Sequence, residues 1–132
     1  RVDCRNNIIR LRNGGGKLAL LSANGVVELG PNWLPIGWAS SHDRLRGKVI
    51  TNGRLLSGES PCFVDEAKAD YRLAPESICI GAGAPLHSNV LPGHALTRQY
   101  FPHQSSKARL TDGTKPDRPL DLGAFEFEPV KK

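Results

Sequence analysis

The densest group of residues with chemical potential lies in an irregular stretch around residue 40. It contains two aromatic and four ionisable side chains, which are Trp33, Trp38, His42, Asp43, Arg44 and Arg46. Aromatic faces stack on sugar rings, a guanidinium pairs with a carboxylate, and a His or Arg beside that carboxylate can take part in proton abstraction. The group therefore predicts a carbohydrate-binding surface formed by Trp33, Trp38, His42, Arg44 and Arg46. The alternative is that the tryptophans pack the loop onto the scaffold while the charges face water.

The remaining candidates lack the spacing that catalysis or metal binding requires. His87, His94 and His103 are seven and nine residues apart, which fits neither H-E-x-x-H nor a zinc finger. Ser77 has no G-x-S-x-G elbow, and Asp112-Gly113 lacks the rest of a calcium-binding loop. The sequence thus predicts no catalytic residue, no metal site and no cofactor.

Composition limits the class of protein and its partners. The 132 residues suffice for one domain with a modest core, and 14 Gly with 10 Pro favour a turn-rich all-β fold. The net charge of +5 favours anionic partners in general, and the alternative is a basic, solvated surface. Nucleic acid is not expected, because the basic residues are dispersed with little aromatic interleaving. No apolar run is long enough for a membrane span.

Short strand-like pieces recur through the first two thirds of the chain. They lie near residues 6, 26, 49, 63 and 79, at uneven spacings that suit a few irregular rungs of a solenoid. Asn6-Asn7 favours a corner with left-handed backbone and amides that ladder between stacked coils, or else an ordinary turn. Asn24-Gly25 equally favours an antiparallel hairpin.

Two later stretches organise the rest of the chain. The first, residues 70–83, reads D-Y-R-L-A-P-E-S-I-C-I-G-A-G, and the second, residues 121–127, reads D-L-G-A-F-E-F. The first predicts an alternating strand, a turn at Ala74-Pro75-Glu76 and a short apolar strand. Its expected buried residues are Leu73, Ile78 and Ile80, with Tyr71 about half buried.

Together these stretches resemble the end of many secreted bacterial right-handed parallel β-helix proteins, the pectate-lyase-like solenoids. The matching positions are Asp70, Tyr71, Arg72, Leu73, Ser77, Ile80, Gly83, Asp112-Gly113, Arg118 and Asp121 to Glu126. The chain departs from the family pattern at Ile78, where Pro is usual, and at Gly81, where Asp is usual. Any polar contact made by that Asp is therefore missing.

The resemblance implies an all-β fold, namely the final rungs of a right-handed parallel β-helix. Residues 1–83 would form these rungs, and residues 84–132 an extended tail with a capping strand over the last open edge. It implies a secreted or cell-surface protein directed at polysaccharide, serving as solenoid cap and carbohydrate-binding surface. Within such a family the positive net charge would favour an anionic polysaccharide as the partner. Two alternatives remain. One is part of a polysaccharide lyase or epimerase with its catalytic rungs upstream, and the other is a structural cell-surface assembly module.

The first strand and the cysteines carry two further expectations. A chain without Met that opens in a strand-like pattern suggests a processed piece of a longer protein. Residues 2–11 would then pair with the preceding part of the precursor or with another chain, because a bare first strand needs backbone partners. Cys62 and Cys79 lie about one rung apart, either as a disulfide or as two buried thiols, and Cys4 is left over.

Overall fold

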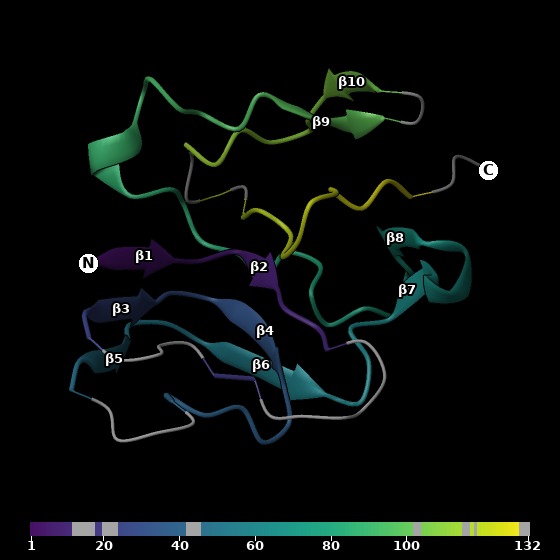
Figure 1. Ribbon diagram of the computed structural model, residues 1–132. Coiled ribbons are helices and arrows are strands. Elements are labelled where there is room, and N and C mark those ends of the chain that lie inside the picture. Colours follow the sequence, from purple (N-terminus) through teal and green to yellow (C-terminus); the bar gives the residue numbers. More distant parts are fainter. Residues whose placement is uncertain are drawn as a thin grey trace.

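The computed structural model describes residues 1–11, 18–19, 24–41, 46–101, 104–114, 117 and 119–129, and these are mostly short strands and connecting turns (Figure 1). The strands are β1 (Val2–Cys4), β2 (Asn7–Ile8), β3 (Val26–Leu29), β4 (Asn32–Pro35), β5 (Lys48–Thr51), β6 (Leu55–Gly58), β7 (Phe63–Asp65), β8 (Asp70–Leu73), β9 (Arg98–Phe101) and β10 (Ser105–Ala108). Within the described ranges, helix is confined to the 3₁₀ turns η1 (Glu66–Lys68) and η2 (Ser88–Val90). The protein is therefore all-β, with small, separate sheets.

Two three-stranded parallel sheets share the first part of the chain. Their orders are β1–β3–β5 and β2–β4–β6, so each strand of the first sheet leads through a short corner into a strand of the second. The register pairs Cys4 with Leu29 and Leu29 with Thr51. A parallel bridge joins Ala19 to Ala39. Three successive turns of chain thus lie side by side, and β3 is not part of an antiparallel hairpin at Asn24-Gly25.

Asparagine side chains join the first two corners. Asn6 has a left-handed φ of 61°. The carbonyl oxygen of the fully buried Asn32 amide accepts from the Asn7 backbone N–H at 2.9 Å and from the Asn7 side chain at 3.1 Å. Its Nδ2 donates to Cys4 O at 2.8 Å and Gly30 O at 3.0 Å. The predicted left-handed backbone is confirmed at Asn6, and one hydrogen bond between side-chain amides joins Asn7 to Asn32.

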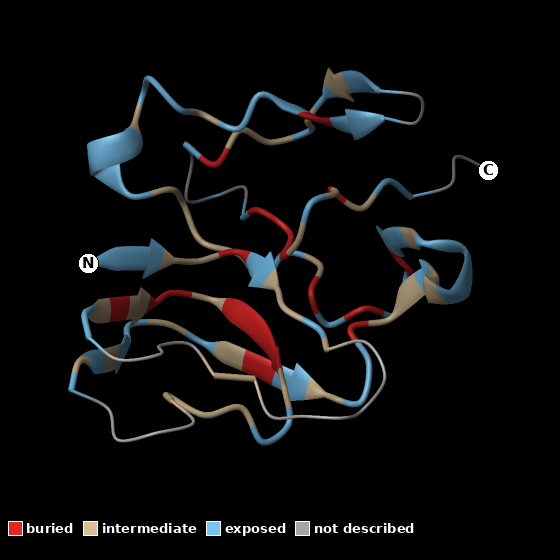
Figure 2. Cartoon of the chain, in the orientation of Figure 1, coloured by how far each residue is buried: buried red, intermediate tan, exposed pale blue. Residues whose placement is uncertain are grey.

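The core lies in two clusters built from alternating strand residues. Val27 and Leu29 of β3 turn inward, where they pack with Leu34. The other cluster contains Trp33, Leu56, Leu73, Cys79 and Leu122. Buried positions concentrate in β3, β4 and the loops that meet them (Figure 2). Because Leu122 belongs to this cluster, the C-terminal stretch is part of the core.

The β7–β8 hairpin partly confirms the expected burial. Leu73 is 5% exposed, whereas Tyr71 is 41% exposed and contacts the Phe63 ring edge-on. The expectation for Ile78 is wrong, because its side chain is 54% exposed. Residues 78–81 form turns instead of a strand, with Ile80 N–H donating to Ser77 O, and this directs Cys79 inward in place of Ile78.

The tail differs from the expected extended cover. Residues 98–108 contain the antiparallel hairpin β9–β10. Residues 121–127 form no strand, which corrects the expected capping strand. The Asn6 side chain exchanges two 2.8 Å hydrogen bonds with the Ala84 backbone, and Gly123 N–H donates to Asn6 O at 2.8 Å. The tail therefore lies against the first turn and not beyond the last one (Figure 1).

The two motif stretches meet directly. Leu122 N–H donates to Cys79 O at 3.0 Å, and Gly83 N–H donates to Leu120 O at 2.7 Å. The Asp121 carboxylate accepts from Gly81 N–H at 2.6 Å through Oδ1 and from Phe127 N–H at 2.5 Å through Oδ2. Gly81 stands where the resembled family usually has Asp. In this chain its backbone N–H donates to the carboxylate of Asp121 in the second stretch.

The three cysteines form no disulfide. Cys4, Cys62 and Cys79 are free, with Cys79 buried and the other two half-buried. The disulfide alternative for Cys62 and Cys79 is therefore wrong. Among the described residues, no helix has the length and apolar character needed to cross a membrane.

Candidate functional site

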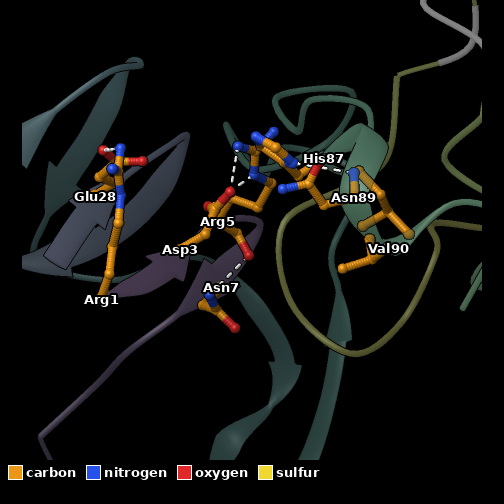
Figure 3. A pocket seen from close by; sticks show the side chains of 9 residues that line it. Arg1, Asp3, Arg5, Asn7, Glu28, His87, Asn89 and Val90 are labelled. Atoms are coloured by element: carbon orange, nitrogen blue, oxygen red, sulfur yellow. Dashed lines mark hydrogen bonds and ion pairs between the residues drawn. The ribbon is translucent and has the colours of Figure 1, made fainter.

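A hollow of about 710 Å³ lies on the outer side of β1 and β3 and is closed on one side by residues 86–90. Seven of its nine lining residues are polar or charged, and their aliphatic parts also contribute surface; the lining consists of Arg1, Asp3, Arg5, Asn7, Glu28, Leu86, His87, Asn89 and Val90. Figure 3 shows these side chains, with Arg1 and Glu28 paired at one end and His87, Asn89 and Val90 at the other. We call it the polar pocket.

Strand alternation builds the floor of the polar pocket. Arg1, Asp3 and Arg5 are spaced by two, so their side chains share one face. Asp3 lies opposite Glu28 in the parallel register, an arrangement in which two carboxylates repel each other. Each is neutralised by a guanidinium, Arg1 on Glu28 and Arg5 on Asp3, so the floor alternates donors and acceptors.

The Arg5–Asp3 pair is held rigidly. Arg5 donates from Nε to Oδ1 at 2.9 Å and from Nη2 to Oδ2 at 2.6 Å, a two-point contact. These hydrogen bonds lower the pKa of the Asp3 carboxyl below its ordinary value, and this outweighs the opposing effect of burial. Asp3 therefore stays ionised near neutral pH and serves as an acceptor, not as a proton donor.

The wall of the pocket is joined to the floor by a hydrogen bond from a side chain to the backbone. Arg5 Nη1 donates to Pro85 O at 3.0 Å, just before the wall begins. His87 Nδ1 accepts from Asn89 N–H at 3.1 Å, so the neutral imidazole carries its proton on Nε2. Leu86 and Val90 add apolar surface. The pocket thus combines planar polar groups with apolar surface.

The chemistry open to the polar pocket follows from the side chains of its lining. The pocket lining contains no Ser, Thr, Cys or Lys that could serve as a nucleophile. Throughout the described part of the chain, no three His, Cys, Asp or Glu side chains are grouped so as to hold a metal ion. The charged, amide and imidazole side chains of the lining can hydrogen-bond to ligand hydroxyl or carboxylate groups.

Of the five residues proposed from the sequence, the structure describes Trp33, Trp38 and Arg46. Trp33 is 1% exposed in the core, so its ring cannot stack on a sugar. Trp38 is half-buried against the Leu34 cluster, and Arg46 is exposed at the bend before β5. His42 and Arg44 lie outside the described residues. The sequence offered His87 only as a metal ligand candidate, and its place in the polar pocket depends on contacts that sequence spacing does not reveal.

Comparisons with known proteins identify no relative. No protein-family model matches the chain, and neither curated proteins nor solved structures give a significant match. The likeness to pectate-lyase-like proteins therefore rests on the two motif stretches alone.

Proposed function

We propose that this chain is a segment of a right-handed parallel β-helix that binds polysaccharide in the polar pocket. The observation that carries the proposal is the lining of that pocket. Seven planar polar side chains surround a hollow that also contains Leu86 and Val90. Sugar hydroxyls both donate and accept hydrogen bonds, so a floor of alternating guanidinium and carboxylate groups complements them.

Three features support the β-helix. Successive turns place their strands in the same two parallel sheets, the Ala19–Ala39 bridge adds a third parallel contact, and asparagines stack at the corner. The motif stretches supply the family likeness and, with it, the right-handed sense and a secreted or cell-surface location. In this proposal the tail caps the first turn through Asn6, Ala84 and Gly123.

The preferred ligand is a polysaccharide that contains uronic acid. The net charge of +5 attracts polyanions, and Arg1 is the guanidinium best placed to take a ligand carboxylate. Its side chain is 72% exposed, whereas Arg5 is committed to Asp3 and Pro85. A uronate would replace Glu28 as the partner of Arg1.

Calorimetric titration with polygalacturonate and with a neutral glucan tests this proposal. Arg1→Gln should weaken polygalacturonate binding by about tenfold, the lower end of what a charge-assisted hydrogen bond contributes. Arg72→Gln is the matched control, since Arg72 is also an exposed, ion-paired arginine, 66% exposed, but lies on β8 outside the pocket. Absence of polygalacturonate binding by the unmodified protein, or equal losses in both variants, would contradict the proposal.

Pairing of β1 with a further polypeptide stays a prediction. β1 is an edge strand of its sheet, with β3 on its other side.

A further inference from the structure

A second hollow, of about 440 Å³, lies between the end of β2, the β7–β8 hairpin and the C-terminal stretch. It is lined by Ile8, Arg10, Phe63, Glu66, Tyr71, Gly123, Ala124 and Phe125, none of which lines the polar pocket. We call it the aromatic pocket. Its volume lies within the range of about 300–1,000 Å³ usual for small-molecule sites.

Three rings form the apolar part of the aromatic pocket. Phe63 and Tyr71 meet edge to face, with centroids 5.3 Å apart and planes at 76°. Phe125 is braced by Tyr100 in a similar contact at 6.4 Å and 67°. These contacts hold the rings in place, and the 41% exposure of Tyr71 leaves part of its surface accessible to a ligand.

A salt bridge forms the polar rim. Arg10 Nε donates to Glu66 Oε1 at 2.6 Å, and its Nη1 donates to Glu59 O at 2.7 Å. Glu66 itself begins η1, where Asp65 accepts from Lys68 N–H at 3.2 Å. The side chains of Arg10 and Glu66 are 32% and 36% exposed, so both reach solvent. Because the two charges cancel, the rim favours hydroxyl groups over a net charge.

Gly123 allows the C-terminal stretch to lie close to Ile8 in this pocket. Its φ is +94°, which strongly favours glycine. A β-carbon there would lie 3.0 Å from Ile8 Cδ1, so a larger residue would press on the pocket. The pocket is thus built by the same docking of tail on first turn that closes the fold.

We propose that the aromatic pocket is a second saccharide site that takes one neutral pyranose ring. A sugar ring offers C–H surface for Tyr71 and Phe125 and hydroxyls for the Arg10–Glu66 pair. A wholly apolar ligand would strip water from that ion pair without replacing its hydrogen bonds. The choice of ligand class rests on the proposed polysaccharide function, whereas the site and its specificity for an uncharged sugar are additional.

Titration of neutral gluco- and galacto-trisaccharides, followed by NMR, tests the site directly. Binding should shift the resonances of the Ile8 methyls and the Gly123 amide. Tyr71→Ser should weaken binding by about tenfold, and Phe101→Ser is the matched control because Phe101 is an aromatic residue, 50% exposed, outside the pocket. Glu66→Gln preserves the shape of the side chain and should also weaken binding, which guards against a Tyr71 variant that fails to fold.

The outcomes separate the two sites. Trisaccharide affinity that is unchanged in Glu66→Gln and in a folded Tyr71→Ser overturns the aromatic site, even if Arg1→Gln weakens polygalacturonate binding. A loss of trisaccharide affinity in both Tyr71→Ser and Glu66→Gln supports the aromatic site. If polygalacturonate binding is at the same time unaffected by Arg1→Gln, the polar site is refuted. Failure of the unmodified protein to bind either trisaccharide also overturns the inference.

Discussion

Among single residues, the Arg109–Glu126 ion pair is the most deeply enclosed charge contact of the described chain. Both side chains are 5% exposed. Arg109 also donates to Ala124 O at 3.3 Å, and Glu126 N–H donates to the Gln99 side chain at 2.8 Å. Burial raises the pKa of Glu126 above its ordinary value, and this outweighs the lowering effect of Arg109. The pair ties the last stretch of chain to the β9–β10 hairpin.

The raised pKa of Glu126 makes its contribution to stability depend on pH. Because its pKa is higher in the folded protein than in the unfolded chain, the contribution is fully present below about 4.5. It is lost as the pH rises through the folded-state pKa. Glu126→Gln should therefore destabilise the protein more at pH 4 than at pH 8.

Urea unfolding of the unmodified protein and of the Gln variant at both pH values measures this difference. Glu76→Gln is the control, since Glu76 is exposed and should show little change at either pH. A Glu126→Gln penalty that grows from pH 4 to pH 8 would reverse the assigned direction of the pKa shift.

The sequence predicted local backbone geometry more accurately than it predicted which side chains are buried. Asn6 takes the left-handed φ that its side chain tolerates, and this could be inferred from the sequence. Trp33 could not be placed, because an aromatic ring suits a core and a ligand site equally. The alternation past Leu73 fails because Ser77 Oγ donates to Pro61 O at 2.5 Å and starts a turn, which places Cys79 inside instead of Ile78.

At the level of elements, the stacked corners depend on one buried amide. Asn32 makes four hydrogen bonds to the first turn and to its own corner. Asn32→Leu keeps a similar volume but leaves buried backbone groups without partners, at about 1–3 kcal/mol for each group. We expect a loss of at least about 2 kcal/mol in the free energy of unfolding.

Asn52→Leu provides the comparison. Asn52 occupies the corner of the third turn and is exposed, so its replacement should change stability by less than about 0.5 kcal/mol. Similar losses in the two variants, measured by denaturant unfolding, would show that the amide ladder does not hold the turns together.

The β9–β10 hairpin shows why part of the tail was unpredictable at this level. β9 reads R-Q-Y-F and β10 reads S-S-K-A, so neither strand alternates apolar with polar residues. Gln99 is nevertheless only 5% exposed. Its amide accepts from Glu126 N–H and donates to Glu128 at 3.2 Å, which replaces apolar burial with hydrogen bonds. A strand whose buried side chain is held by hydrogen bonds shows no hydrophobic alternation in the sequence.

For the whole molecule, Asp121 is the point where the two motif stretches are joined. Its two oxygens accept from Gly81 and Phe127. Asp121→Asn preserves the shape but removes the charge and turns an NH₂ group toward one of these donors. We expect a loss on the order of 1.5–3 kcal/mol, as for a hydrogen bond to a charged group.

Denaturant unfolding and amide hydrogen exchange measure the effect. Exchange should accelerate at Gly81 and Phe127, and Asp117→Asn, at an exposed position, should leave both amides unchanged. Unchanged protection in the Asp121 variant would mean that the tail is held chiefly by its apolar contacts.

The all-β class and the importance of the two stretches could be predicted because turn residues and apolar strands are local signals. The polar pocket could not. It joins the face of β1 and β3 to residues 86–90, and the chain between them folds back only through tertiary contacts. The aromatic pocket likewise needs β2, β7, β8 and the tail in place.

The docking of the tail on the first turn also sets a delay during synthesis. Asn6 pairs with Ala84, which is 78 residues later in the chain. At about 5–20 residues per second, a ribosome needs roughly 4–16 s to make that stretch. The hydrogen bond between Gly123 N–H and Asn6 O can form only after Gly123 has also been made. For those seconds β1 and β2 emerge with one margin uncovered, so a chaperone that attends this nascent chain would find a binding site on the first turn.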